Sequence, residues 1–184
     1  MSTTTKNIVQ IALMAAIICI LGPLSLPIGP VPISLTPFAI FLVVYILGMK
    51  KGTIAVLIYL LIGLCGVPVF SSFSGGAAKL FGPTGGYIIA YILTAAIAGF
   101  FIDKFYNKIY LQVVGMVLGL AVLYLIGTLW LAYQAGMTLE AAAAAGVWSF
   151  VILDLVKIAA AIILGRAVRS ALTKAGFLGK AQKA

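Results

Sequence analysis

The sequence contains no histidine and only 3 acidic residues, and charged residues make up 8% of its 184 positions. The absence of histidine excludes serine-histidine-aspartate triads, HExxH zinc sites and every other site that uses an imidazole. The scarcity of charge excludes a water-soluble fold, because 64% of the residues are hydrophobic and too little polar surface would remain to cover them. The composition therefore predicts an all-α integral membrane protein.

Motifs for metal binding, redox chemistry and nucleotide hydrolysis are missing as well. Cys19 and Cys65 lie in apolar runs without CxxC spacing, which indicates small buried hydrophobic residues. No GxxxxGK[ST] sequence occurs, so any energy for uphill transport must come from elsewhere. The formal net charge of +9 does not indicate nucleic-acid binding, because the chain offers no soluble domain with a basic patch. We expect no cofactor and no metal.

Apolar segments follow one another with short connections, which predicts a bundle of six transmembrane helices in a single domain, residues 1–184. The expected bounds are residues 5–22, 36–49, 52–66, 84–102, 109–134 and 141–166. Prolines crowd the position where a signal peptide would be cleaved, so the first segment is expected to remain a helix. The second and third segments are shorter than the roughly 20 residues that a bilayer needs. Either they end inside the protein beside a cavity, or these boundaries are misplaced by a few residues.

Basic residues indicate on which side of the membrane each loop lies. With both termini in the cytoplasm, Lys79 is the one basic residue in an external loop, and Lys157 lies inside a helix. The cytoplasmic parts hold all the others, which are Lys6, Lys50, Lys51, Lys104, Lys108, Arg166, Arg169, Lys174, Lys180 and Lys183. The opposite orientation would reverse this distribution, so the sequence predicts cytoplasmic N- and C-termini.

Two distinctive loops then lie together on the outer face. Residues 22–32 are rich in proline, which forbids a helix and favours a stiff, extended segment. Residues 66–86 are rich in glycine and serine, and glycine allows the backbone to approach a ligand closely. We interpret these 1-2 and 3-4 loops as the lid and wall of an outward-facing pocket. Plain connections between helices are the alternative.

Asp154 and Lys157 lie three residues apart within the apolar stretch of residues 146–164. Each ionised group costs roughly 2.5 to 3.5 kcal/mol at the centre of a membrane helix, so the pair needs an explanation. At this spacing both side chains share one helix face, together with Phe150. A carboxylate accepts N–H donors and an ammonium donates to a carbonyl, so the pair matches a small ligand with both groups. A structural ion pair that locks helix packing is the alternative.

Two further patterns concern helix faces. Hydroxyl groups form a stripe along the fourth segment, at Thr84, Tyr87, Tyr91 and Thr94. They either line the same cavity as Asp154 or hold helices together by hydrogen bonds. In the first segment, Ala12 and Ala16 form a small-xxx-small pair, which allows another helix to approach closely and makes this face a candidate docking surface.

Three sequence features carry a resemblance to a known family. They are Val31-Pro32-Ile33 in the first loop, Gly75-Gly76 with Phe81-Gly82-Pro83-Thr84-Gly85-Gly86-Tyr87 in the second, and Asp154-x-x-Lys157 in the last helix. With them, nearly the whole chain resembles the substrate-binding S components of energy-coupling factor (ECF) transporters, in particular the biotin-specific BioY family. The resemblance implies a six-helix protein that captures biotin from outside, together with a transmembrane T component and two ABC-type ATPases.

The resemblance also implies roles for individual residues. Asp154 and Lys157 look like polar ligands of the vitamin, and Gly75, Gly76 and Tyr87 look like parts of its pocket. The pair Ala12 and Ala16 resembles the surface that meets the T component. The chain departs from the family at Thr36, where glutamine is common, and at Ile88, where some members have arginine. These departures leave recognition of the ligand's carboxylate unassigned, with Lys79 as a candidate and a solvated loop lysine as the alternative.

We therefore expect high-affinity capture of biotin, without covalent chemistry, by a multi-pass protein of a prokaryotic plasma membrane. The expected substrate-binding residues are Asp154, Lys157, Tyr87, Gly75, Gly76, Ser74, Thr36, Tyr91, Phe150 and Lys79. One alternative is an S component for another carboxylated cofactor precursor, such as dethiobiotin or lipoate. A second is an intramembrane hydrolase with Asp154 and Lys157 as acid and base, which the lack of histidine and of G-x-S-x-G disfavours. A channel or secondary carrier is a third, and it would need a continuous polar path.

Overall fold

The computed structural model describes residues 3–26, 31–148 and 150–178, and most of them are helical. The long helices are α1 (Thr3–Leu21), α2 (Thr36–Leu47), α3 (Met49–Leu64), α5 (Gly85–Lys104), α6 (Ile109–Ala135) and α8 (Val151–Lys174). The short elements are β1 (Ser25–Leu26), β2 (Ile33–Ser34), α4 (Ala77–Leu80), α7 (Leu139–Ala143) and the π-helical turn η1 (Ala144–Trp148). The long helices agree with the predicted bundle.

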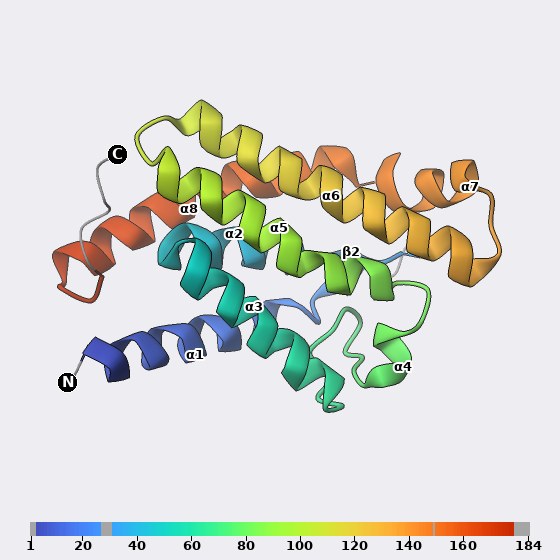
Figure 1. Cartoon of the computed structure of the whole chain (residues 1–184), viewed down its shortest axis with the longest axis horizontal. Helices are drawn as coiled ribbons and strands as arrows, with labels where there is room; N and C mark the ends of the chain where they lie inside the picture. Colours follow the sequence, from blue (N-terminus) through green and yellow to red (C-terminus); the bar gives the residue numbers. More distant parts are fainter. Residues whose placement is uncertain (1–2, 27–30, 149, 179–184) are drawn as a thin grey trace.

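Helix α5 lies at the centre of this bundle. It packs against α6 along its length and also contacts α3 and α2 (Figure 1). Helix α8 packs mainly on α2, whereas α1 lies at the edge of the bundle against α3 and α2. The two ends of the chain lie at one end of the molecule, and α4 and α7 lie at the other (Figure 1).

Helices α2 and α3 are short, as the sequence predicts. They contain 12 and 16 residues, so they rise about 18 and 24 Å, less than the roughly 30 Å of a bilayer core. Among the described residues, Thr4–Leu21, α5, α6 and Leu139–Lys174 are long and apolar enough to cross a membrane. Because α2 starts directly after β2, the non-helical backbone before it enters the bundle, where such backbone is tolerated only if it is buried or lines a cavity.

The first loop contains the antiparallel pair of β1 and β2, in which Ser25 lies opposite Ser34. Extended backbone was the expectation for residues 22–32, and β1 confirms it for Ser25 and Leu26. Pro27 and Pro30 lie outside the described residues. The second loop contains α4, a short helix that the glycine-rich sequence does not predict.

The last helix is interrupted, which corrects the continuous helix expected over residues 141–166. Helix α7 ends at Ala143, η1 follows, and α8 begins at Val151 and continues to Lys174. An alanine-rich run favours a regular α-helix. Tertiary packing overrides this preference, because η1 sets Gly146 against Tyr87 so closely that a Cβ at Gly146 would lie 1.9 Å from the tyrosine hydroxyl oxygen. Single π-helical turns of this kind are frequent at functional sites.

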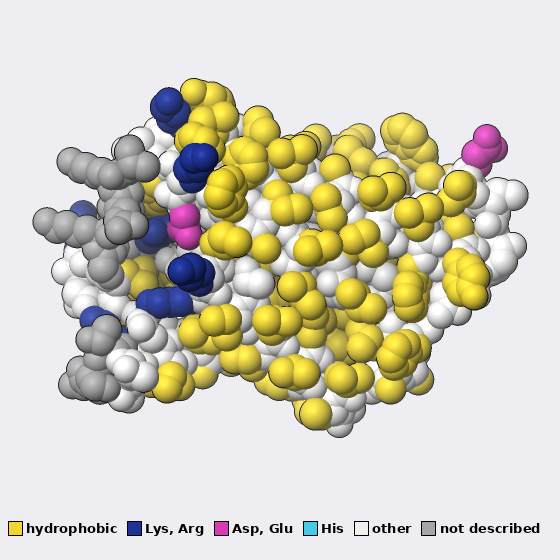
Figure 2. Space-filling model, in the orientation of Figure 1, with side chains coloured by type: hydrophobic (Ala, Val, Ile, Leu, Met, Phe, Trp, Pro, Cys, Tyr) yellow, Lys and Arg dark blue, Asp and Glu magenta, His cyan; other side chains and the backbone are white. Residues whose placement is uncertain are grey.

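Charge and hydrophobicity are distributed as in a membrane protein. Basic side chains gather at the end where α1 begins and α8 ends, and hydrophobic side chains cover most of the rest of the face in view (Figure 2). The sequence predicts this gathering of basic residues, although Lys180 and Lys183 lie outside the described part of the chain. Cytoplasmic placement of the basic end stays a prediction.

A buried polar network closes the basic end of the bundle. The Tyr45 hydroxyl donates to Gln112 Oε1 at 2.6 Å, and Arg169 donates to the Tyr45 carbonyl at 2.9 Å. The Gln112 amide donates to the carbonyls of Phe105 and Tyr106 at 3.0 and 2.6 Å. Because Gln112 is fully buried and its amide is satisfied, these contacts join α2, α6 and α8 without an unpaired polar group.

Candidate substrate-binding site

A cavity lies among α2, α5, α6, η1, α8 and the two loops, towards the end opposite the basic residues. Its volume is about 490 Å³ including the open mouth, and the enclosed part that water can enter is about 50 Å³. Its wall is mostly apolar, with a few polar groups, which is the usual composition of a small-molecule site. This enclosed volume is small, so a ligand larger than a few water molecules must push lining side chains apart.

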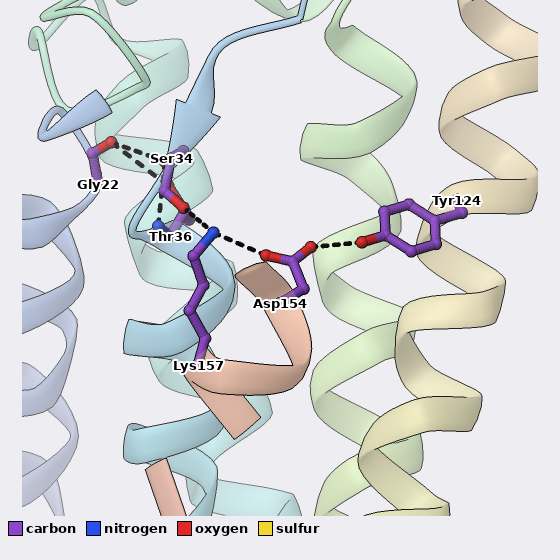
Figure 3. A network of polar contacts seen from close by, with 6 residues as sticks. All are labelled: Gly22, Ser34, Thr36, Tyr124, Asp154 and Lys157. Carbon is purple, nitrogen blue, oxygen red and sulfur yellow. Dashed lines mark hydrogen bonds and ion pairs between the residues drawn. The ribbon is translucent and has the colours of Figure 1, made fainter. Parts of the chain in front are cut away.

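The inner end of the cavity holds a connected polar network (Figure 3). The Lys157 ammonium donates to Asp154 Oδ1 at 2.6 Å and to the Ser34 carbonyl at 2.7 Å. The Tyr124 hydroxyl donates to Asp154 Oδ2 at 2.5 Å. Asp154 is 3% exposed and lies in the first turn of α8, where the helix dipole favours a negative charge. Burial, a cation, a hydroxyl and a helix terminus thus hold one carboxylate in a fixed orientation.

A second set of hydrogen bonds fixes the Ser34 carbonyl that Lys157 uses (Figure 3). The Ser34 and Thr36 hydroxyl oxygens lie 2.6 Å apart, and each lies 3.3 Å from the Gly22 carbonyl oxygen, so one hydroxyl donates to the other and the second donates to Gly22. Ser34 lines the cavity, whereas Thr36 lies behind it and is 1% exposed. The structure therefore places Thr36 as support for β2, not in the cavity wall.

Tyr87 forms one wall of the cavity, between two glycines. A Cβ at Gly127 on α6 would lie 2.2 Å from its ring, and a Cβ at Gly146 on η1 would lie 1.9 Å from its hydroxyl oxygen. That hydroxyl also lies 3.3 Å from Thr128 Oγ1. Only glycine leaves room for the ring at both positions, so the sequence of α6 and η1 fixes where this wall stands.

The hydroxyl stripe on α5 divides between the two roles left open by the sequence. Thr84, Tyr87 and Tyr91 line the cavity. Thr94 does not line it, because its hydroxyl donates to the carbonyls of Ala90 at 3.0 Å and of Gly119 on α6 at 3.1 Å. Phe150, expected on the face of Asp154 and Lys157, also lines the cavity.

Trp130 on α6 holds the glycine-rich block before α5. Its indole N–H donates to the Gly82 carbonyl at 2.9 Å, and a Cβ at Gly86 would lie 2.3 Å from the tryptophan Cβ. The sequence suggests a membrane-interface role for tryptophans at this level. The structure gives Trp130 a specific one, because it anchors the loop that carries Thr84.

We expect Trp130→Phe to lower the free energy of unfolding by about 1 kcal/mol, because the Gly82 carbonyl loses its donor while the ring contact with Gly86 stays. Thermal unfolding in detergent measures this change. The matched control is Trp148→Phe, since Trp148 is 75% exposed. Equal stability losses in the two variants would contradict an anchoring role for Trp130.

The loop of residues 66–76 is held against the first loop. The Ser72 amide donates to Ser25 Oγ at 2.8 Å and to the Pro23 carbonyl at 3.1 Å. Ser72 and Phe73 have φ of 61° and 52°, a strained conformation for residues with a Cβ. The docked loop brings Ser71 to the cavity. Strained backbone that surrounding contacts hold in place is common beside binding sites.

Three residues expected at the pocket shape this loop without lining the cavity. A Cβ at Gly75 would lie 2.4 Å from the Val67 carbonyl oxygen, and Gly76 has a φ of 84° at the start of α4. The Ser74 hydroxyl donates to the Ser71 carbonyl at 2.7 Å. The sequence indicates that glycine is needed at these positions. The structure shows that the backbone of the turn requires it, and not contact with the cavity.

Lys79 and the alanine pair also lie away from the cavity. Lys79 is in α4, outside the membrane-spanning helices, and burial lowers the pKa of its ammonium below the ordinary value. Ala12 and Ala16 are exposed on α1, the helix at the edge of the bundle. The structure therefore leaves this face of α1 open, as a docking surface requires.

Sequence reasoning missed two members of the inner network. Tyr124 is one of four aromatic residues in α6, and Thr128, four residues further on, shares its helix face, a spacing that the sequence reasoning did not use. Ser34 contributes its backbone carbonyl, which no residue type reveals. Their contacts become visible only when β2, α6 and α8 are brought together.

Comparisons with known proteins agree on one family. A family model described as BioY family matches residues 1–174. The chain is 40% identical over 159 residues to a probable biotin transporter BioY of Pyrococcus horikoshii, covering 86% of this chain and 93% of that protein. It is 36% identical to the biotin transporter BioY of Thermotoga maritima, with the same coverage, and 34% identical to the biotin transporter BioY2 of Lactococcus lactis, with 94% of each chain covered.

One solved structure is similar over most of the chain. It is a crystal structure of the S component for biotin from an ECF-type ABC transporter, with a TM-score of 0.82 and 33% identity. The similarity covers 92% of this chain and 95% of that one. The order and packing of the helices described above are therefore those of that membrane protein.

Proposed function

The chain belongs to the BioY family of transporter components, and we propose that it captures biotin with high affinity as the S component of an ECF-type uptake system. The observation that carries the proposal is the buried Asp154, Lys157 and Tyr124 network at the inner end of a mostly apolar cavity. Biotin combines a ureido ring, which is polar, with an apolar chain that ends in a carboxylate. This distribution of polarity matches the cavity.

The ureido group can join the network without breaking the ion pair. A carboxylate has about four acceptor positions, and Lys157 and Tyr124 use two of those on Asp154. Lys157 uses two of the three donors of an ammonium, towards Asp154 and the Ser34 carbonyl. Asp154 can therefore accept a ureido N–H while Lys157 donates its third N–H to the ureido carbonyl. The pair is satisfied when empty and complementary to the ligand when occupied.

The same chemistry separates biotin from the alternatives. Dethiobiotin keeps the ureido group, whereas lipoate lacks it and offers no donor to Asp154. A hydrolase is not favoured, because the family consists of transporter components. A hydrolase would also need a free serine beside Asp154 and Lys157. The Ser34 hydroxyl on β2 is already hydrogen-bonded to Thr36 and to the Gly22 carbonyl.

We further propose the orientation and the partners. The basic end of the molecule lies in the cytoplasm, because basic residues flank membrane helices on that side. The cavity then opens outwards in the plasma membrane of a prokaryotic cell. A transmembrane T component docks on the face of α1 that carries Ala12 and Ala16, and two ABC-type ATPases supply the energy. Small residues permit the close helix contact that such docking needs.

Equilibrium binding to the purified protein in detergent tests this function. We expect biotin to bind tightly, dethiobiotin to bind measurably and lipoate to bind at least a hundredfold more weakly, because lipoate cannot form the hydrogen bonds that a ureido group forms with the charged Asp154 and Lys157. Preferential binding of lipoate would overturn the assignment of biotin. Uptake of biotin by cells that lack the T component, at the full rate, would overturn the assignment of partners.

A further inference from the structure

The outer end of the cavity contains a hydroxyl group with no assigned use. Thr84 lines the cavity and is 9% exposed. It is the N-cap residue of α5, where a threonine side chain normally accepts from a first-turn amide. Here the side chain makes no such bond, and it has no hydrogen-bond partner among the described residues. The Thr84 hydroxyl is not among the enclosed polar atoms left without a partner, so it is accessible at the cavity and free to bond a ligand.

The first turn of α5 adds free backbone donors at the same place. Gly85 donates to the Gly82 carbonyl and Ile88 to the Thr84 carbonyl, at 2.9 and 3.4 Å. The amides of Gly86 and Tyr87 find no acceptor within the described part of the chain. Helix α5 contains 20 residues, so its N-terminus carries the partial positive charge of a full helix dipole. Free amides with this charge form a ready site for an anion.

A carboxylate is usually bound by a lysine or an arginine, but the described residues of the cavity wall offer no unpaired cation. Among the described lining residues, Lys157 is the one cation, and it is already paired with Asp154 at the inner end. Ile88, which also lines the outer end, is apolar. An acid that places its polar ring on Asp154 and Lys157 must therefore leave its carboxylate to neutral donors.

The spacing of the two ends fits one extended ligand. On α6, Tyr124 contacts Asp154 at the inner end and Trp130 contacts Gly86 at the outer end. These positions are six residues apart, which is about 9 Å along a helix. A ureido ring with an extended chain of four methylenes covers a distance of this size. Tyr87, Phe150 and Leu123 line the space between and suit the apolar chain.

We infer that the N-terminus of α5 is the carboxylate subsite, where the ligand accepts hydrogen bonds from the Thr84 hydroxyl and the free amides of Gly86 and Tyr87. This inference rests on the proposed function and deepens it. The chain would then recognise an acid at this end without an arginine or lysine. Ser71, which lines the cavity from the second loop, supplies a further hydroxyl at the mouth.

Paired ligands test the subsite. The affinities of biotin and of its primary amide, biotinamide, are measured for the wild type, Thr84→Val and Thr84→Ser. The wild type should prefer the acid. Thr84→Val keeps the shape but removes the hydroxyl, so biotin should bind about tenfold to a hundredfold more weakly while biotinamide changes less than about twofold. Thr84→Ser should restore most of the preference for the acid.

Two controls separate this role from a structural one. Thr94→Val removes another buried hydroxyl from α5 that does not line the cavity, and it should leave the preference for the acid unchanged. Lys157→Ala should weaken the acid and the amide equally, since Lys157 contacts the ring. Thermal unfolding in detergent shows that each variant is folded before its affinities are compared.

Each remaining outcome is decisive. Equal weakening of acid and amide by Thr84→Val, or no weakening of either, would overturn the subsite. Loss of the acid preference in Lys157→Ala alone would overturn it too, because the carboxylate would then lie at Lys157. A wild type that binds biotin and biotinamide equally defeats this inference and leaves the proposed function standing. A wild type that binds neither removes both.

Discussion

Lys157→Ala is expected to lower the affinity for biotin by about a hundredfold or more, and to destabilise the protein. Removing one member of a buried ion pair costs about 3 to 5 kcal/mol, since the remaining charge is left without its partner. Asp154, at 3% exposure, would keep the Tyr124 hydroxyl but lose the ammonium. The Ser34 carbonyl would lose a donor as well. Equilibrium binding and thermal unfolding in detergent measure the two effects.

A double variant separates stability from recognition. Asp154→Leu combined with Lys157→Met removes both charges, and apolar replacements of a buried pair are often neutral for folding. We expect this variant to regain most of the stability lost by Lys157→Ala and to bind no biotin. Biotin affinity within tenfold of the wild type in either variant would show that the pair only holds helices together, which is the structural alternative suggested by the sequence.

Gly146→Ala is expected to weaken biotin binding by about tenfold to a hundredfold through a single methyl group. The new Cβ would lie 1.9 Å from the Tyr87 hydroxyl oxygen, far inside van der Waals contact. The ring cannot retreat towards α6, because a Cβ at Gly127 would already lie 2.2 Å from it. Overpacking of this kind costs about 1 to 3 kcal/mol and would drive the ring into the cavity.

Tyr87→Phe supplies the matched rescue. It removes the atom that clashes, and the next ring atom, Cζ, lies 3.1 Å from the same Cβ position. The double variant Gly146→Ala with Tyr87→Phe should therefore bind biotin within a few-fold of Tyr87→Phe alone. A double-mutant cycle measures this coupling. Additive effects of the two substitutions would contradict the direct contact between η1 and the ring of Tyr87.

Much of the fold follows from hydrophobic segments, because a membrane imposes long apolar runs and a one-sided distribution of basic residues. The bounds of α5 and α6 differ from the expected ones by at most two residues. The break at η1 does not follow from sequence, since alanine favours helix and the deviation depends on Tyr87, which lies almost 60 residues away. The true extent of α8, to Lys174, lies in a polar segment outside the hydrophobic pattern.

Some residues of the candidate site could be predicted from the sequence, and others could not. Asp154 and Lys157 stand out because charge is rare in this chain, and Tyr87 and Tyr91 are found from helical spacing. Tyr124 lies on α6 and Ser34 on β2, and the sequence around neither residue shows that it meets α8. The sequence shows that glycine is needed at Gly75 and Gly76, but it does not show why. The structure shows that a turn requires these glycines and that they do not line the cavity. Chemistry at one site can be read from the chain, whereas complementarity between segments needs coordinates.

The inner network has zero net charge, because Asp154 and Lys157 cancel. The empty site therefore offers no net charge on which the electric field of the membrane can act. With neutral donors at α5, the loaded protein carries the full negative charge of biotin. Each elementary charge that crosses 100 mV changes the energy by about 2.3 kcal/mol. Under the proposed orientation and partners, a membrane voltage that is negative inside opposes the inward movement of bound biotin, and ATP hydrolysis by the proposed ATPases supplies that work.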